Sequence, residues 1–292
     1  MRYVVGYVPD RGGAEAVHLA STLAGGIGVR LDIVVVLPVD EPSFHIYSQD
    51  RAYHLNLAAQ GREWLDQALR LVPEGVEAQG VLREAESITE GLIAAAVDPD
   101  LGPEAGAIVI GASHGGLIGR FSAGSVASAL LHSAPVPVAL APNGYEPEPR
   151  ITRITCATGT RQGAEALLEV AISAAGRRQV PLRLMSLIAL DRDDESRAER
   201  VAVAERHAAA MVEHASAGLP DESPVTSVVA TGKTLESSVS RLDFEHSEIV
   251  LLGSSRLAGP KRVFVGASAN KILRALPVPI VVVPREYEET VV

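Results

Sequence analysis

Two segments of the chain repeat each other at a constant spacing, and this repeat constrains the fold more than any other feature. Residues 106–142 align with residues 248–284 without a gap, and paired residues in the two segments stand 142 positions apart. The pairs are Gly111 and Gly253, Arg120 and Arg262, Gly124 and Gly266, Pro135 and Pro277, and Pro142 and Pro284. Such a repeat indicates a duplicated structural unit. A chain of 292 residues is long enough for two domains of average size.

Each half alternates apolar runs rich in Val and Ile with stretches that carry Ala and Leu at helical spacing. Strands are expected at residues 3–8, 31–37, 76–82, 107–111 and 136–141, and again near 154 and at 182–188, 225–229, 248–253 and 278–283. Helices are expected at residues 14–24, 55–71, 88–96 and 125–132. Runs that are apolar throughout suit strands buried on both faces, so the pattern predicts an α/β fold with parallel sheets.

The expected domain boundary lies in the polar segment between the halves. Residues 143–149 combine an Asn-Gly turn dipeptide with two prolines and two acids. Such a composition is typical of a connection rather than of a strand or helix. We therefore expect a first domain at 1–143, a linker at 144–150 and a second domain at 151–292.

Composition excludes several classes of partner. The net charge of −10 disfavours binding to nucleic acid, which requires basic surfaces. No apolar run is long enough to span a membrane, and residues 1–8 resemble neither a secretory nor an organelle leader, so a cytoplasmic location without membrane attachment is expected. The single cysteine, Cys156, fits a reducing compartment and is expected to be a buried thiol.

A glycine-rich segment follows the fourth expected strand of each half. The strands end at Gly111 and Gly253, and the next helices begin at Gly124-Ser125 and at Gly266-Ala267-Ser268. Glycines allow a ligand to approach the backbone, and the free N–H groups of a first helical turn stabilise an anion. The alternative interpretation is that these glycines only form a tight turn.

The arrangement resembles the universal stress protein family, whose nucleotide-binding members carry Gly, two residues, Gly, nine residues and then Gly-Ser or Gly-Thr. The resemblance implies two tandem flavodoxin-like domains, of the type shared with adenine nucleotide alpha hydrolase-like proteins. Each would hold a five-stranded parallel sheet of order 3-2-1-4-5. It also implies that ATP or a related adenine nucleotide binds at the carboxyl ends of strands one and four, the usual ligand crevice of such sheets.

Carried onto the first half, the family motif gives Gly111, Gly124 and the hydroxyl of Ser125, but its second glycine falls on His114, with Gly115 one place later. In the second half Gly253 and Gly266 match, Arg256 replaces the second glycine, and Ala267 replaces the hydroxyl residue. Three neighbouring hydroxyls complete the candidate phosphate site: Ser113, Ser255 and Ser268.

The acidic residue that resembles an adenine anchor in this family falls on Val8 in the first half and on Thr158 in the second. Backbone groups beside Val36 and Leu187 are the remaining candidates for holding a purine edge. Because Ser125 can donate to a phosphate and Ala267 cannot, the first domain is expected to bind nucleotide better than the second. Arg256 opposes that ranking if its guanidinium points toward the phosphates.

The resemblance also implies how the halves associate, because members of this family form homodimers through their final strands. Strands 136–141 and 278–283 are therefore expected to lie antiparallel and side by side as an internal pseudo-dimer. A homodimer of the whole chain and an unidentified protein partner stay open.

Three other patterns need an interpretation, of which the first two are disfavoured as functional sites. Gly111 to Gly115 reads G-x-S-x-G, but nine residues separate it from Ser125, whereas the nucleophile elbow of an esterase leads directly into its helix. His207 and His214 lie two helical turns apart, too far to share a metal ion unaided. The aromatic-rich segment 44–54 is interpreted as a loop packed on its own domain, a cover for the first cleft or a subunit contact.

Two function classes are consistent with the sequence. The first is a nucleotide-binding stress protein whose hydrolysis is slow or absent, because the segment has neither a P-loop lysine nor paired carboxylates for magnesium. The second is an interaction protein that keeps the fold and has lost the ligand.

Overall fold

The computed structural model describes residues 1–39, 48–112, 124–159, 164–190, 196–255, 258, 262–285 and 287, and of residues 48–54 it describes the backbone only. The strands of the first half are β1 (Arg2–Gly6), β2 (Arg30–Pro38), β3 (Ala78–Ala85), β4 (Ala107–Gly111) and β5 (Val138–Ala141). Those of the second half are β6 (Arg153–Ala157), β7 (Leu182–Ala189), β8 (Val225–Gly232), β9 (Glu248–Gly253) and β10 (Ile280–Val283).

Helices connect these strands in both halves. The first half contains α1 (Arg11–Ala24), α2 (Ser48–Leu69), α3 (Ile88–Ala96), the short 3-10 helix η1 (Pro99–Leu101) and α4 (Ser125–Ser133). The second half contains α5 (Ala164–Arg178), α6 (Arg197–Ala217), α7 (Leu235–Val239) and α8 (Ala267–Ala275). No helix in the described part of the chain is both long and apolar enough to cross a membrane.

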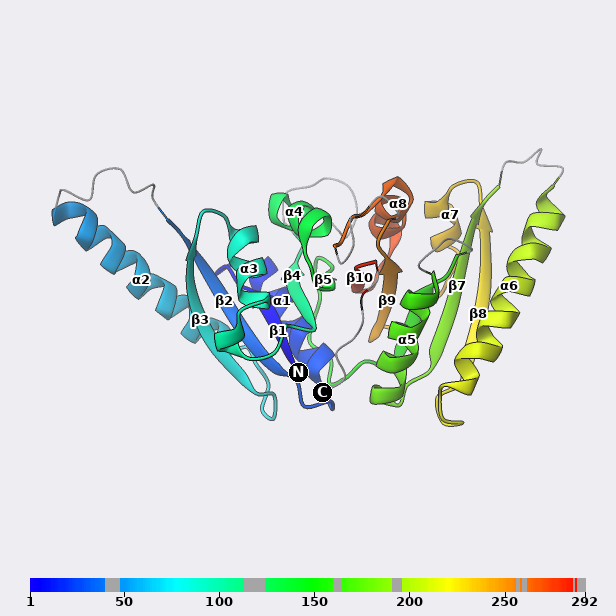
Figure 1. Ribbon diagram of the computed structural model, residues 1–292, viewed down its shortest axis with the longest axis horizontal. Helices are drawn as coiled ribbons and strands as arrows, with labels where there is room; N and C mark the ends of the chain where they lie inside the picture. The colour runs from blue at the N-terminus through cyan, green and yellow to red at the C-terminus, as the bar shows by residue number, and fades with distance from the viewer. Residues whose placement is uncertain are drawn as a thin grey trace.

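All ten strands form one sheet with the order β3-β2-β1-β4-β5-β10-β9-β6-β7-β8 (Figure 1). Within each half neighbouring strands are parallel, so the predicted α/β class is confirmed. The halves meet where β5 and β10 pair antiparallel, with Leu140 opposite Ile280 and Val138 opposite Val282. The final strands therefore lie side by side as predicted.

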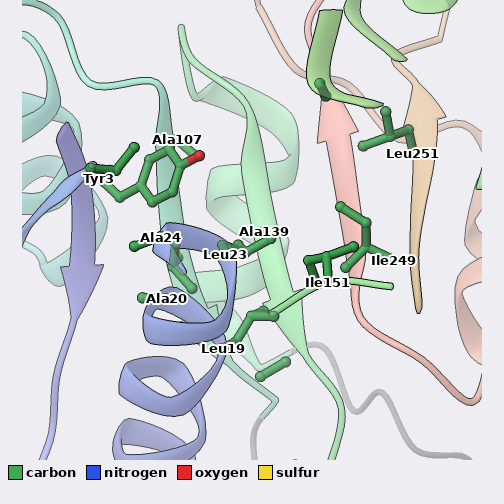
Figure 2. Close-up of a cluster of buried hydrophobic side chains, with 14 of the residues drawn as sticks. Tyr3, Leu19, Ala20, Leu23, Ala24, Ala107, Ala139, Ile151, Ile249 and Leu251 are labelled. Atoms are coloured by element: carbon green, nitrogen blue, oxygen red, sulfur yellow. The ribbon is translucent and has the colours of Figure 1, made fainter. Parts of the chain in front are cut away.

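Helices cover both faces of this sheet. Side chains of α1, α2, α5 and α6 pack into one buried cluster, and those of α3, α4, α7 and α8 pack into a second cluster on the opposite face. The first cluster continues across the junction: Leu19 and Leu23 of α1 lie in the same cluster as Ile249 and Leu251 of β9 (Figure 2). The two halves therefore share their hydrophobic core.

The segment between the halves packs against α1. Gly144 donates its backbone N–H to Glu15 Oε1 at 2.6 Å, and Glu148 donates to Thr22 Oγ1 at 3.1 Å. Tyr145 is buried between these contacts, and burial raises the pKa of its phenol to about 12. From the second half, Arg178 donates to the carbonyl of Leu23 at 3.0 Å. Hydrogen bonds of Gly144 and Glu148 thus hold the predicted linker, 144–150, against α1. The exact limits of the linker stay a prediction.

A second contact between the halves involves α4. The backbone N–H groups of Val263 and Val265 donate to the carbonyls of Ala134 and Leu131 at 2.9 and 3.1 Å. Carbonyls at the end of a helix lack partners within it, so the segment 262–266 stabilises α4 by supplying these donors. The same segment leads directly into α8.

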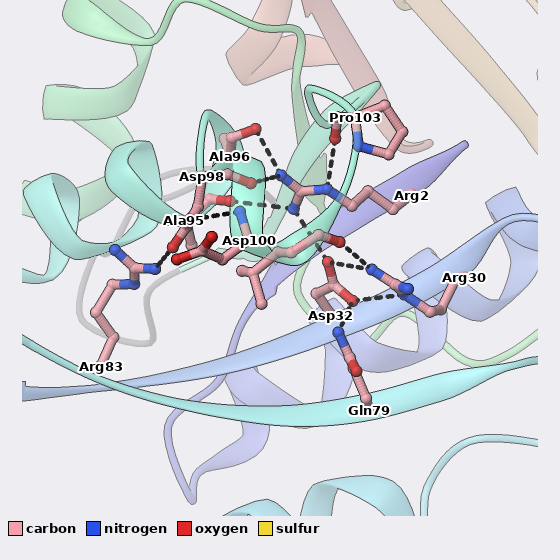
Figure 3. Close-up of polar contacts among 11 residues, drawn as sticks. Arg2, Arg30, Asp32, Gln79, Arg83, Ala95, Ala96, Asp98, Asp100 and Pro103 are labelled. Carbon is pink, nitrogen blue, oxygen red and sulfur yellow. Dashed lines mark hydrogen bonds and ion pairs between the residues drawn. The ribbon is translucent and has the colours of Figure 1, made fainter. Parts of the chain in front are cut away.

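Strand β1 begins with a charged side chain buried in a polar network (Figure 3). Arg2 is 1% exposed and lies 3.0 Å from a carboxylate oxygen of Asp32, which is fully buried in β2. Arg2 also donates to four carbonyls, those of Ala95, Ala96, Asp98 and Pro103. Arg30 and Gln79 complete the shell around the Asp32 carboxylate. A buried ion pair is tolerated only when its remaining donors and acceptors are satisfied, as they are here.

Cys156 lies fully buried in β6, as predicted, and burial raises the pKa of its thiol to about 12. Because the thiolate is the reactive form, the folded protein should react with a thiol reagent at pH 8 far more slowly than the protein in denaturant. Labelling with a chromogenic disulfide measures both rates. Native-state labelling at the rate of an exposed cysteine would show that β6 opens readily.

Candidate functional site

A cleft of about 270 Å³ lies in the first half at the carboxyl ends of β1, β2 and β4. This is the position where the order of a parallel sheet reverses and leaves a crevice. The structure brings together five of the predicted site residues there: Val8, Val36, Gly111, Gly124 and Ser125. They come from four separate segments of the chain, so the first cleft is assembled by the fold.

A larger cleft of about 930 Å³ occupies the equivalent place in the second half. It brings together the predicted residues Thr158, Leu187, Gly253, Ser255, Gly266 and Ser268. Each half therefore has one cleft formed by the predicted segments.

Backbone groups of β2 and β7 face these clefts. Tyr7 donates its N–H to the carbonyl of Val34 at 3.0 Å, and β1 has already ended at Gly6. Because backbone groups of a strand alternate between its two neighbours, those of Val36 point to the β1 side beyond the end of β1. Thr158 donates to Met185 at 2.8 Å in the same way, which places Leu187 in the corresponding position. These groups suit recognition of a purine edge.

The two helices at the clefts start without a side-chain cap. Gly124 and Gly266 are the N-cap residues of α4 and α8, and neither helix has a capping hydrogen bond from a side chain. The first-turn N–H groups therefore keep their capacity to bind a ligand atom. Ser125 adds an exposed hydroxyl at the start of α4, whereas the exposed Ala267 adds none at the start of α8.

Gly111 packs closely against the start of α1. A Cβ at position 111 would overlap the carbonyl oxygen of Gly12, which lies well inside 3.0 Å of that position. At Gly253 the nearest described atom to such a Cβ is Leu167 Cδ2 at 3.4 Å, an ordinary contact. In the first half, therefore, the end of β4 touches the backbone of α1, whereas the alternative interpretation of these glycines as parts of a tight turn falls on residues outside those described and stays open.

Hydroxyl groups and Arg200 are among the described residues that line the second cleft. Ser254 Oγ accepts the N–H of Phe264 at 2.7 Å, and the N–H of Ser255 donates to the Phe264 carbonyl at 2.7 Å. Arg200 of α6 lines the cleft and donates to the carbonyl of Ala189 at 3.2 Å, with Glu199 beside it. The segment before α8 is thus fixed against the end of β9.

Strand register corrects one pairing of site residues. Gly6 pairs with Val34 and Ala157 with Met185, so the structural counterpart of Val8 is Gly159, and that of Thr158 is Tyr7. The resemblance to the family instead places Val8 and Thr158 at one and the same position, that of the acidic residue, and the strand register differs from this match by one residue.

Four predicted site residues lie outside the described residues: Ser113, His114, Gly115 and Arg256. In the aromatic segment 44–54, residues 44–47 are likewise outside them, whereas the backbone of residues 48–54 forms the first part of α2, so the interpretation of this part as a loop is wrong. His214 lies 2.7 Å from Glu169, and among the described residues no three potential ligands gather into a metal site.

Sequence reasoning misses several residues that line the clefts. Tyr7, Asp10, Trp64 and Ile88 line the first cleft, and Arg200 lines the second. Asp10 follows an apolar strand and precedes a helix, so its role as the α1 cap is visible in the sequence; its Oδ1 accepts the N–H of Gly13 at 2.8 Å. No local pattern points to Trp64, because it reaches the cleft from the C-terminal part of α2 through the packing of that helix on the sheet.

The sequence matches the family model described as "Universal stress protein family" over residues 1–142 and again over residues 150–284. A universal stress protein of Mycobacterium tuberculosis is 30% identical over 296 residues, which cover 97% of this chain and 100% of that protein. One of Mycobacterium bovis matches to the same extent. The crystal structure of a universal stress protein from Archaeoglobus fulgidus has a TM-score of 0.65 at 15% identity, covering 97% of this chain and 98% of that one.

Proposed function

The chain belongs to the universal stress protein family, and from this membership we propose that it is a stress-response module that binds ATP or a related adenine nucleotide. Binding would shift a conformational or partner equilibrium inside the cell. Hydrolysis would be slow or absent, because the glycine-rich segments carry neither a P-loop lysine nor paired carboxylates for magnesium.

The observation that carries this proposal is the convergence of the predicted residues in both clefts. An unpaired strand edge suits an adenine, and an uncapped helix start suits a phosphate. Each half supplies these two features from segments that are far apart in the sequence, beside Val36 and Gly124 or beside Leu187 and Gly266.

Replacing Ala267 by Ser should strengthen ATP binding, because it adds at the start of α8 the hydroxyl that matching family members carry. A hydrogen bond to a charged group contributes about 1.5–3 kcal/mol, so the dissociation constant should fall by about tenfold or more. Calorimetric titration of ATP measures this. Ala275→Ser, at the other end of the same helix, is the matched control and should leave the affinity unchanged.

The alternative function, a ligand-free interaction protein, makes the opposite prediction. Under it, neither the parent chain nor Ala267→Ser would bind ATP, AMP or cyclic AMP, and mass spectrometry of the natively purified protein would release no nucleotide. Either nucleotide release or saturable titration excludes it.

A further inference from the structure

The two clefts occupy equivalent places but differ in size. The first measures about 270 Å³ and the second about 930 Å³. Small-molecule pockets usually hold about 300–1,000 Å³. We propose that the clefts divide the ligand chemistry: the first binds a neutral, flat heteroaromatic ring system of nucleobase or nucleoside size, and the second binds the phosphorylated nucleotide. For the second cleft the inference rests on the proposed function.

The lining of the first cleft is apolar and aromatic. Tyr7 and Trp64 approach from one face of the sheet, and Leu92 approaches from the other. Val8 and Ile88 also line this cleft, yet they are 40% and 38% exposed. An apolar ligand would remove these two side chains from water, and a flat ring is the shape that stacks best on an indole.

Charge in the first cleft disfavours an anion. Asp10 is the only charged residue among the described residues that line it, and no described lysine or arginine does so. The Asp10 carboxylate is held in place because it caps α1. Among the described lining residues, a polyphosphate would meet this negative charge with no basic side chain to offset it.

Backbone contact also shortens the first cleft. The end of β4 touches the start of α1 at Gly111 and Gly12, which leaves no room for even a methyl group between them. At the matching position Gly253 the nearest described atom lies 3.4 Å from such a methyl group. A compact ligand can be accommodated beside the closed floor of the first cleft, and the larger second cleft has more room for an extended one.

The second cleft has the polar groups that phosphates require. Arg200 lines it with a guanidinium that also donates to the carbonyl of Ala189, and Ser268 adds an exposed hydroxyl in the first turn of α8. Guanidinium groups bind phosphates through paired hydrogen bonds. Glu199 is the one acid among the described residues of this lining. This assignment gives the second cleft the higher affinity for ATP, whereas the hydroxyl of Ser125 alone predicts a higher affinity in the first cleft. An experiment can therefore distinguish the two rankings.

Trp64 is the only tryptophan of the chain, so its fluorescence reports on the first cleft alone. Adenosine is the neutral probe and ATP the charged one. Adenosine should quench or shift the Trp64 emission in a saturable way. ATP should bind calorimetrically with little change in that emission, and Arg200→Ala should weaken ATP binding by about tenfold without changing the adenosine titration.

Two substitutions by glutamate, one beside each cleft, test the two binding sites separately. Ile88→Glu places an acid in the first turn of α3, where a helix tolerates negative charge, and should weaken adenosine binding alone. Val203→Glu places an acid in the middle of α6 beside the second cleft and should weaken ATP binding alone.

Each outcome decides the inference. If ATP changes the Trp64 emission as strongly as adenosine does, or if Ser125→Ala lowers ATP affinity while Arg200→Ala does not, the division is wrong although nucleotide binding stands. If adenosine leaves Trp64 unchanged, the first cleft does not bind a neutral ring. If ATP binds nowhere while adenosine still quenches Trp64, the proposed function fails for the second cleft and the first-cleft assignment survives.

Discussion

Gly111→Ala should destabilise the protein by about 3 kcal/mol, because the new methyl group would occupy the space of the Gly12 carbonyl oxygen. Backbone atoms on both sides are fixed, β4 by its ladder and α1 by the Asp10 cap, so neither can move away cheaply. Urea unfolding followed by circular dichroism measures the loss.

Gly253→Ala is the matched control at the equivalent position. Among the described residues its methyl group would make an ordinary contact with Leu167, and the substitution restricts the unfolded chain, so stability should change by less than about 1 kcal/mol. Equal losses for the two variants would show that the contact between β4 and α1 does not distinguish the halves.

Asp32→Ala should cost about 3–5 kcal/mol, because it leaves the buried guanidinium of Arg2 without its carboxylate. Four carbonyl contacts would still hold Arg2 in place, so the charge could not escape to water without unfolding the start of β1. Chemical denaturation gives the difference in free energy of unfolding.

The control for this prediction is Glu169→Ala, which removes a carboxylate that lies 2.7 Å from His214 with both side chains largely exposed. Exposed pairs contribute about 0–1 kcal/mol, so the loss should be small. An Asp32→Ala loss no larger than this would mean that water reaches Arg2 in the folded protein.

Much of the fold is predictable from the sequence because the internal repeat and the apolar strand patterns extend over many residues. The repeat of 142 positions holds in the structure: Gly111 pairs with Ala141, and Gly253 pairs with Val283, at matching points of the two halves. Strand limits are less predictable. β3 runs from Ala78 to Ala85 rather than over 76–82, because its register with β2 continues to the pair of Pro38 and Ala85.

The candidate site is predictable where backbone chemistry determines it and not where packing does. Glycines at the starts of α4 and α8 mark the clefts directly. Trp64 and Arg200 reach the clefts from helices whose sequences show no local sign of it, because their approach depends on how α2 and α6 pack on the sheet. Strand register, which the sequence pattern does not reveal, makes Gly159 rather than Thr158 the counterpart of Val8.

The antiparallel pairing of β5 with β10 takes place within one chain. Two copies of a single domain would have to meet by diffusion, and their pairing would be lost on dilution. Here the tether keeps the local concentration of one half around the other in the millimolar range or above, whatever the amount of protein present. The two halves are also encoded separately, so a substitution in one cleft is not copied into the other. Each cleft is thus free to change its ligand without loss of the shared interface.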